Sequence, residues 1–334
     1  MDFSLLFDNF AAYTISGLAL GSVYALVALG YTMVYGVLQL INFAHSEVFM
    51  YGTFATVFTM YLLESAGLEL SASGPKFILI MLICLVAAMT ASSLIALLLE
   101  RVAYRPLIKR DAPKLVALIS AIGASFMLAE LMGLRSKVLG WIDAPAWLEK
   151  YLGRSRDVKS LPIDIKPSKV VNVFGYDVTN VDLLVIISAL LMMFALDQYV
   201  RRSKQGRAIR AVAQNPEAAA LMGVNSTRVV QLTFLLGGMM AGAAATLYMI
   251  RIGATKFDVG FVLGVKAFTA AVLGGIGNLR GALLGGLVLG VAENWGSALI
   301  GTEWKDVVAF VLLVLILLFR PTGLLGEALG KARA

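Results

Sequence analysis

The sequence predicts an all-α fold, a polytopic transmembrane helical bundle with discontinuous helices. Of the 334 residues, 59% are hydrophobic and only 15% are charged, a balance that is typical of membrane proteins and not of water-soluble domains. The apolar residues form long runs separated by shorter charged segments. Within the runs charges are rare, because each one costs about 2.5–3.5 kcal/mol at the centre of a bilayer. Polar residues and glycines nevertheless interrupt some of them, which predicts breaks in the helices.

The first apolar segment begins the bundle. The chain has no Lys or Arg before Lys76, so it lacks the basic region of a secretory signal peptide, and we expect this segment to stay attached. The segment runs from Phe10 to Gly30. It carries Gly17 and Gly21 four residues apart, a spacing that lets two membrane helices approach closely. The N-terminus before it is expected on the outer side.

The next apolar segment is interrupted at bilayer depth. The interrupting side chains are Asn42, His45, Ser46 and Glu47. No Lys or Arg accompanies them to mark a turn exposed to water. We therefore predict a half-span over Tyr31–Ile41, a break, and a second span that ends near Leu63.

Four further spans follow, and the charges between them indicate their orientation. These spans cover Phe77–Leu99, Leu115–Met132, Asp182–Val200 and Val229–Ile250. Basic residues in Arg101–Lys114 place that loop inside the cell. The segment 133–181 then lies outside, and it is too small and too poor in apolar periodicity for a core of its own. Its eight basic residues oppose the charge rule, which long loops follow less strictly.

The last third of the chain is rich in glycine. Two spans, Phe261–Arg280 and Gly281–Ile300, form a predicted hairpin, and Val307–Phe319 is the last span. The hairpin contains Gly274, Gly275, Gly277, Gly281, Gly285, Gly286 and Gly290. Lys331 and Arg333 place the C-terminus inside. The prediction is nine crossings and one half-span.

The basic segment 201–228 between two spans is the largest inner loop. Asn215 and Pro216 form a helix start, as an N-cap and a first-turn proline, and Gly223 forms its C-cap. Two short helices around a bend are predicted over Arg207–Met222. The expected apolar face consists of Ile209, Val212, Ala213 and Leu221. Such a segment either lies in a groove of a soluble partner or simply connects two spans.

Polar groups at bilayer depth are retained mainly where they line a path or pair with one another. The candidates are Asn42, His45, Glu47, Lys266, Glu293 and Asn294. A broken helix also exposes backbone N–H and C=O groups that water or an amino-acid-like zwitterion can satisfy. The interrupted and glycine-rich regions therefore suggest a shared central path. The alternatives are structural: Lys266 paired with Glu47 or Glu293, and glycines used only for tight helix packing.

Several kinds of site are absent from the sequence. No GxxxxGK[ST] phosphate-binding motif occurs, so any ATP that drives this protein must bind to another subunit. GGIGNLRG is one residue too long for a dinucleotide fingerprint, and no predicted strand precedes it. One cysteine, Cys84, and one histidine, His45, exclude an intrachain disulfide, a metal site built on several thiolates and a conventional zinc cluster. No nucleophile and base can be paired, so an enzyme is not expected.

Longer motifs occur in order along nearly the whole chain: GSVYALVALGYTMVYG, INFAHSEVFMYG, ERVAYRPL, LISAIGAS, GRAIRAVAQ and KAFTAAVLGGIGNLRGALLGG. Together they resemble the LivH-type permease subunit of the branched-chain amino-acid ABC transporter family. That family usually has Gly where this chain has Ser46, directly after the histidine. The segment 133–181 shows no matching motif.

The resemblance implies a coupling role for the inner loop. Its sequence is similar to the EAA loop with which ABC-importer permeases dock on their ATPase. The residues expected to couple are Arg207, Arg210, Glu217, Ala218, Ala219 and Gly223. Those expected to line or gate the path are Asn42, His45, Glu47 and Lys266, with Gly274, Gly275 and Gly277 permitting close approach or bending. The chain is then one permease domain, 1–334, with a periplasmic loop at 133–181 and a cytoplasmic coupling loop at 201–228.

The function implied is inward transport of leucine, isoleucine and valine across the bacterial inner membrane by alternating access. The expected partners are a LivM-like second permease, two ATP-binding subunits that use ATP-Mg, a periplasmic amino-acid-binding protein and membrane lipid, with no nucleic acid. No cofactor or metal is expected on this chain. Two alternatives stay open: transport of urea or short amides by a relative of the same family, and an ion-coupled secondary transporter or channel that acts alone.

Overall fold

The computed structural model describes residues 3–68, 70, 74–110, 112–143, 148 and 153–326. Its α-helices are α1 (Phe3–Asp8), α2 (Phe10–Leu38), α3 (His45–Ser65), α4 (Gly74–Leu99), α5 (Arg105–Lys109), α6 (Lys114–Gly133), α7 (Arg135–Trp141), α9 (Asn180–Arg202), α10 (Lys204–Gln214), α11 (Pro216–Leu221), α12 (Ser226–Ile252), α13 (Val259–Gly274), α14 (Leu279–Ile300) and α15 (Lys305–Phe319). A π-helix, η1 (Glu100–Tyr104), joins α4 to α5, and a 3-10 helix, η2 (Thr302–Trp304), precedes α15. The predicted all-α bundle is confirmed.

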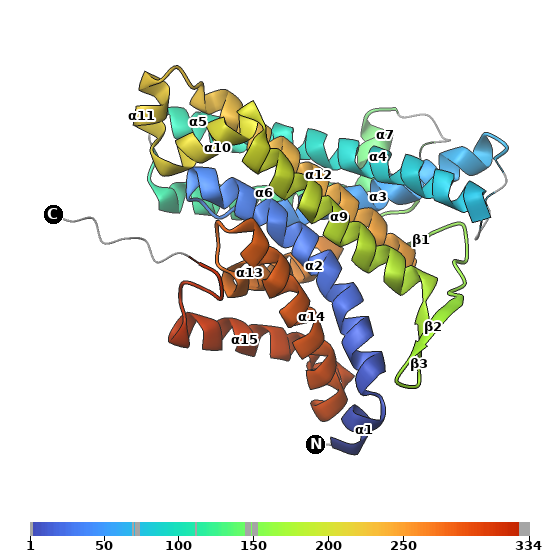
Figure 1. Cartoon of the computed structure of the whole chain (residues 1–334). Coiled ribbons are helices and arrows are strands. Elements are labelled where there is room, and N and C mark those ends of the chain that lie inside the picture. The colour runs from blue at the N-terminus through green and yellow to red at the C-terminus, as the bar shows by residue number, and fades with distance from the viewer. Residues whose placement is uncertain are drawn as a thin grey trace.

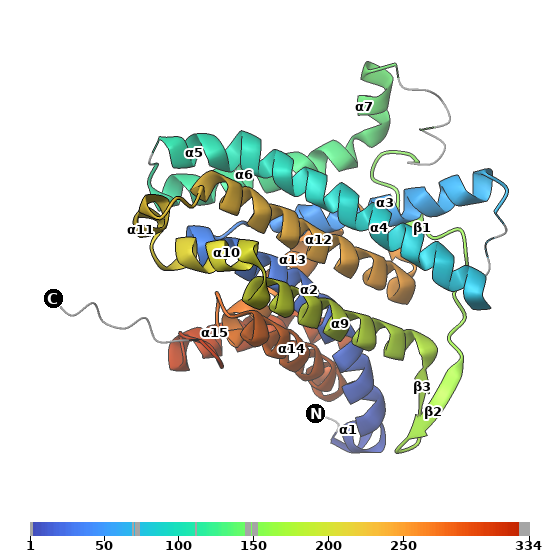
Figure 2. The same ribbon diagram turned by 45° about the horizontal axis from the view of Figure 1, so that its top comes forward.

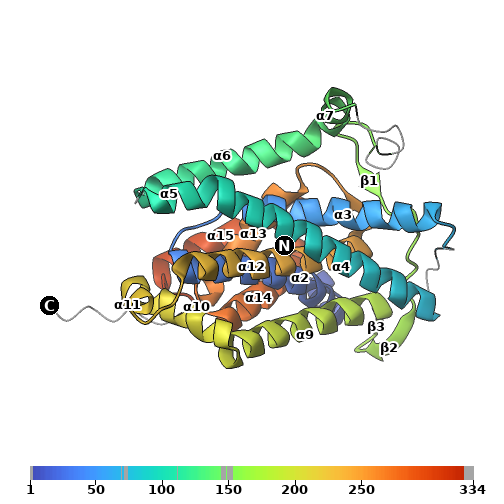
Figure 3. The same cartoon turned by 90° about the horizontal axis from the view of Figure 1, so that it is seen from above.

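The strands are short, with two to five residues each. They are β1 (Lys159–Ser160), β2 (Lys169–Val173), β3 (Tyr176–Thr179) and β4 (Ala254–Thr255). β2 and β3 form an antiparallel hairpin, and β1 pairs antiparallel with β4. The β2–β3 hairpin lies at one end of the bundle, while α5, α10 and α11 gather at the other (Figures 1 and 3). We call these the hairpin end and the knob end.

Two helices form the centre of the bundle. In the most apolar 18-residue windows, 89% of α2 and 78% of α12 are buried, against 28% in α6 and in α9. Figure 2 shows α2 and α12 in the middle, with α4 and α6 on one side and α14 and α15 on the other. The outer helices keep large apolar side chains on their exposed faces, as lipid contact requires.

Small residues let the central helices pack closely. A Cβ atom on Gly17 would lie 2.7 Å from the Cα of Val291, and one on Gly21 would lie 2.6 Å from the carbonyl oxygen of Gly286, both on α14. On α12, a Cβ on Gly238 would lie 2.7 Å from the Cα of Ser93 on α4. The close approach predicted at Gly17 and Gly21 is therefore confirmed, and Gly238 packs in the same way.

Within the described residues, six helices are long and apolar enough to cross a membrane: α2, α4 with its continuation to Lys109, α6, α9, α12 and α14. The other three predicted crossings are also helices, α3, α13 and α15. α13 has 16 residues and is about 24 Å long, less than the roughly 30 Å hydrocarbon core, so it crosses only part of it.

Two predicted boundaries were wrong, and one prediction falls on residues that the structure does not describe. The half-span over Tyr31–Ile41 does not exist as a separate element, because α2 continues without a break through Gly30 to Leu38. The ring of His45 occupies the space beside Gly30, which explains a glycine inside this helix. The turn of the last hairpin lies before Leu279 and not at Gly281, because Asn278 caps α14. The C-terminal residues Lys331 and Arg333 lie outside the described residues.

Candidate functional site

The break between α2 and α3 returns the chain into the bundle. α2 ends at the knob end, where the Lys114 ammonium donates to the Gln39 amide oxygen over 3.3 Å. Residues 39–44 then lead back, so that the ring of His45 packs edge-on against Tyr31 with centroids 5.0 Å apart. Tyr31 precedes the end of α2 by seven residues, or about 10 Å of helix. The first turn of α3 therefore begins within the bundle, as the prediction of a discontinuous helix requires.

Asn42 lies in this returning segment and is 2% exposed. Its Oδ1 accepts a 3.0 Å hydrogen bond from the Tyr104 hydroxyl in η1, while its Nδ2 has no partner among the described residues. Tyr104 in turn packs on Phe234 of α12 at 5.2 Å. The break is thus tied directly to the π-helical end of α4.

Glu47, in the first turn of α3, is 1% exposed. Its Oε1 has two long contacts of 3.3 Å, from the hydroxyls of Ser46 and Ser125. Ser46 also donates to the carbonyl of Phe43 over 2.7 Å, so its single proton serves the shorter bond. No described donor reaches Oε2. This carboxylate is therefore poorly satisfied for a buried charged group.

A second break, between α12 and α13, meets the first. The Thr255 hydroxyl in β4 lies 2.7 Å from that of Thr53, inside the bundle on α3. Farther along, a Cβ on Gly260 would lie 2.7 Å from Glu47 Oε2, so the first turns of α3 and α13 are adjacent. The sequence prediction missed this break. Its signal was the short polar run around Lys256 and Asp258 between two apolar segments.

Lys266 lies apart from Glu47 and belongs to a different cluster. Its ammonium is 2.5 Å from Glu293 Oε1 on α14 and 2.5 Å from Asp306 Oδ1 on α15. The Glu293 side chain is fully buried, and the Lys266 side chain is 8% exposed. Of the two pairings considered from the sequence, Lys266 with Glu293 is the one observed. This cluster joins α13, α14 and α15.

The glycine-rich turn between α13 and α14 lies at the knob end. Gly275 and Gly277 have φ values of +105° and +98°, which favour glycine because a Cβ is strained there. The backbone N–H groups of Leu324 and Leu325 donate to the carbonyls of Leu273 and Gly274 over 2.8 and 3.0 Å. The chain after α15 therefore closes over this turn. The space beside Gly274 is filled by the backbone of Gly281, which is the close approach expected of it.

The predicted pair of short helices in 201–228 is confirmed as α10 and α11. Asn215 caps α11 by accepting a 2.9 Å hydrogen bond from the Ala218 N–H, and Gly223 follows the helix with φ +83°. The Arg210 guanidinium donates over 2.9 Å to the carbonyl of Val200, so it closes the end of α9. Arg207 is exposed on the same helix.

One part of the expected apolar face was wrong. Ile209 and Val212 are buried against the bundle, but Leu221 is 89% exposed and the following Met222 is 85% exposed. Of the α11 residues, Ala219 alone is buried, while Glu217 and Ala218 face solvent. The bend at Asn215 explains the difference, since it turns α11 away from the face that α10 presents to the bundle.

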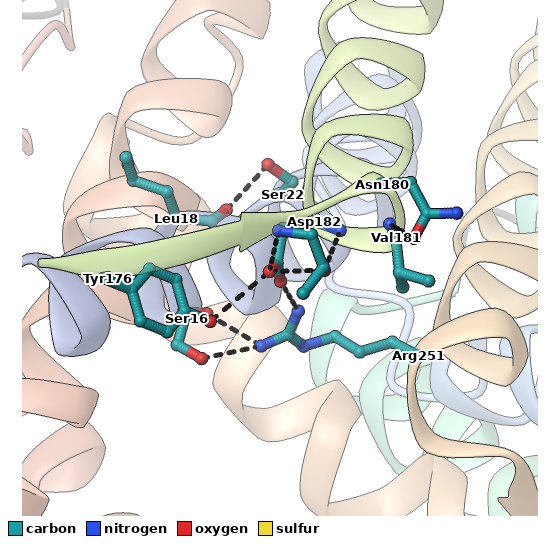
Figure 4. A network of polar contacts seen from close by, with 9 residues as sticks. Ser16, Leu18, Ser22, Tyr176, Asn180, Val181, Asp182 and Arg251 are labelled. Atoms are coloured by element: carbon teal, nitrogen blue, oxygen red, sulfur yellow. Dashed lines mark hydrogen bonds and ion pairs between the residues drawn. The ribbon is translucent and has the colours of Figure 1, made fainter. Parts of the chain in front are cut away.

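At the hairpin end, an ion pair ties three helices together (Figure 4). The Arg251 guanidinium at the end of α12 pairs with the Asp182 carboxylate at the start of α9, and it donates to the Ser16 hydroxyl of α2 over 2.9 Å. Asp182 also completes a capping box with Thr179. These residues carried no signal in the sequence beyond their position at predicted span ends.

The segment 133–181 is anchored to α3 by cations. The Arg135 guanidinium, 5.1 Å from the centroid of the Phe54 ring, donates to the carbonyl of Asp157 over 2.9 Å. The Lys159 ammonium lies 5.6 Å from the Tyr61 ring centroid. Burial lowers the pKa of Lys159, and the positive charge of Arg135 lowers that pKa further, against the opposing effect of Asp157.

The sequence of this chain is similar to those of known transport proteins. A family model described as branched-chain amino acid transport system / permease component matches residues 13–317. The permease protein BraD of the high-affinity branched-chain amino acid transport system of Pseudomonas aeruginosa is 42% identical over 317 residues, covering 94% of each chain. LivH of Escherichia coli, named for the same type of system, is 41% identical over 328 residues, 96% of this chain and 97% of LivH.

Among solved structures, PsaBC from Streptococcus pneumoniae in complex with Fab aligns over 96% of this chain and 97% of that chain, with a TM-score of 0.45 and 10% identity. The sequence matches and the six apolar helices make this chain a multi-pass inner-membrane protein. It belongs to the family of branched-chain amino acid transport system permease components.

Proposed function

We propose that this chain is the permease subunit of an ABC importer that moves branched-chain amino acids into the cell. The family membership supports the substrate class, since BraD and LivH are named for it. The proposed assembly contains a LivM-like second permease, two ATPase subunits that bind ATP-Mg, and a periplasmic amino-acid-binding protein. In this arrangement the knob end faces the cytoplasm, and 133–181 at the hairpin end faces the periplasm.

The observation that carries the proposal is the exposed surface of α10 and α11 at the knob end. Leu221 and Met222 project from the bundle at 89% and 85% exposure, on a loop rich in exposed arginine and lysine. Large apolar side chains with this exposure, set among charges, mark an interaction site. Glu217, Ala218, Ala219 and Gly223 shape this surface, and Arg207 borders it. Arg210 supports the surface indirectly, by fixing α10 to the end of α9.

The proposed mechanism is alternating access. Closure of the ATPases on ATP moves α10 and α11, and this motion reaches the two helix starts that meet near Glu47. Asn42, His45 and Glu47 line the path, and the turn at Gly274, Gly275 and Gly277 lets α13 move relative to α14. Lys266 holds α14 and α15 to α13 while they do so.

Reconstitution of the complete complex in proteoliposomes tests the function. We expect leucine uptake that requires ATP-Mg and the binding protein, with urea and small amides taken up at least tenfold more slowly. Faster urea or amide uptake would assign the chain to that alternative substrate class. Leucine uptake driven by an ion gradient through this chain alone would overturn the proposal in favour of a secondary transporter.

A further inference from the structure

We infer that the Glu47 Oε2 atom is the binding point for the α-ammonium group of the transported amino acid. The inference rests on the proposed function and names the group that recognises its substrate. It begins from the buried carboxylate at the junction of the α3 and α13 starts. That carboxylate is 1% exposed, and no described donor contacts Oε2.

The basic side chains of the neighbouring elements are engaged elsewhere. Lys266 on α13 bonds Glu293 and Asp306, both at 2.5 Å. Lys256, before α13, pairs with Asp258 at 3.2 Å. Arg135, beyond α6, bonds the carbonyl of Asp157. A mobile cation can therefore supply the charge that Oε2 lacks.

Asp258 extends this negative site toward solvent. Its side chain is 47% exposed, yet its Oδ1 is buried and has no described partner. Asp258 precedes Gly260, the residue beside Glu47 Oε2, by only two positions, so both carboxylates would attract a cation at the start of α13. The half-exposed acid at the start of α13 therefore adds negative charge beside the buried acid at the start of α3.

The chemistry of the site fits an ammonium better than a metal ion. Calcium takes six to eight oxygen ligands, and within the described ranges no group of three or more carboxylate, His or Cys side chains is placed to hold a metal. A primary ammonium carries three N–H donors, and two unpartnered carboxylate oxygens with a serine hydroxyl match that number. The absence of a Cβ on Gly260 keeps the backbone close to Oε2 and the site narrow, which suits a small head group.

This recognition separates amino acids from the neutral alternatives. Urea and short amides have N–H donors but no positive charge, so they cannot compensate a buried carboxylate. Binding of an ammonium at Oε2 would therefore favour the zwitterion.

The test is leucine binding to the purified complex in nanodiscs without the binding protein, so that affinity reports on the membrane subunits alone. Glu47→Gln should weaken leucine binding about tenfold to a hundredfold, because one charge-assisted hydrogen bond is lost. The amine 3-methylbutylamine should compete with leucine in the wild type and not in the variant, while 4-methylpentanoate, which lacks the ammonium, should compete weakly in both. Glu130→Gln is the matched control, since it removes a half-exposed carboxylate from the end of α6 that pairs with Arg156.

Unchanged leucine affinity in Glu47→Gln would overturn the inference. If that variant does not assemble, Asp258→Asn decides, because its side chain is half exposed; an affinity within twofold of wild type would again overturn it. Unchanged affinity in either variant would leave the proposed function standing as long as the wild type takes up leucine with ATP. Loss of ATP-driven uptake in the wild type would instead contradict the proposed function itself.

Discussion

The Tyr104 hydroxyl donates a 3.0 Å hydrogen bond to Asn42 Oδ1, joining the π-helical end of α4 to the break between α2 and α3. Tyr104 is 1% exposed and Asn42 is 2% exposed, so water does not compete for the bond. Because η1 leads directly into α5 at the knob end, movement there reaches the break through one side chain. Single-turn π-helices are frequent at functional sites, and here the π-helix carries the side chain that contacts the break.

Removing that hydroxyl tests the connection. Tyr104→Phe leaves the ring on Phe234 but leaves Asn42 Oδ1 without a donor, a loss of about 1 kcal/mol. A bond that is made in the transition state of transport and is weaker in the resting state lowers the barrier. We therefore expect Tyr104→Phe to transport about fivefold more slowly, with unchanged amounts of protein in the membrane. ATP-driven leucine uptake, normalised to the complex present, measures the change.

Tyr51→Phe is the control for this prediction. The Tyr51 hydroxyl donates to the carbonyl of Leu128 over 3.2 Å, so it joins α3 to α6 and not α4 to Asn42. Equal slowing in both variants would show that the effect comes from loosened packing and not from the connection to Asn42.

The α10–α11 knob yields a second prediction. Gly223→Val places a β-branched residue at φ +83°, which strains the backbone by about 1–3 kcal/mol and displaces the turn after α11. We expect the complex to assemble and hydrolyse ATP while leucine uptake falls at least tenfold. The ratio of amino acid transported to ATP hydrolysed measures this loss of coupling.

A second glycine with positive φ tests whether backbone strain alone, at a place outside the α10–α11 loop, reduces coupling. Gly67 has φ +81°, and a Cβ atom added to it would meet no neighbouring atom within 4 Å, yet it lies after α3, far along the chain from the knob. Gly67→Val should leave the ratio unchanged. Normal coupled uptake in Gly223→Val would refute the assignment of this turn to the ATPase contact.

The sequence predicted elements better than it predicted where they meet. Apolar runs and caps located α9 to α12, including the Asn215 cap, because these signals are local. The starts of α3 and α13 depend on which helices they lie between. Nothing in the residues around Glu47 indicates that Ser125 and Gly260 lie beside it, since those contacts span 78 and 213 positions of the chain (47 to 125 and 47 to 260).

The Lys266 cluster shows the same limit. An isolated lysine in an apolar span predicts a carboxylate partner, and Glu293 was one of two considered, but the second partner, Asp306, sits at the start of the last helix. The sequence gives no sign that the Asp306 carboxylate pairs with Lys266, because the pairing depends on how α15 packs against α13. Composition thus identifies that a buried charge must be paired, while tertiary packing chooses the partner.

Breaking this cluster should destabilise the protein. Lys266→Met leaves the fully buried Glu293 carboxylate without its cation, at a loss of about 3–5 kcal/mol. We expect a lower midpoint of thermal unfolding in detergent and less protein in the membrane. Adding Glu293→Gln to the same chain should recover most of the stability, because the uncompensated charge is gone. A double variant as unstable as the single one would contradict the pairing as the source of the effect.

The Arg251–Asp182 pair at the hairpin end gives a matched comparison of a protected and an open ion pair. The side chains of Arg251 and Asp182 are 18% and 5% exposed, whereas that of Arg280, which pairs with Asp197 at 3.3 Å, is 56% exposed. Arg251→Gln should lower stability by about 3 kcal/mol, because it also detaches α12 from Ser16 on α2.

Arg280→Gln should lower stability by less than about 1 kcal/mol, since solvent screens an exposed pair. Thermal unfolding of the two variants at low salt and at several-fold higher salt separates the cases. The wild-type contribution of Arg280 should weaken at the higher salt concentration, while that of Arg251 should persist, because screening acts far less on a buried pair. Equal losses in the two variants would mean that the Arg251 contacts with α9 and α2 do not hold the hairpin end together.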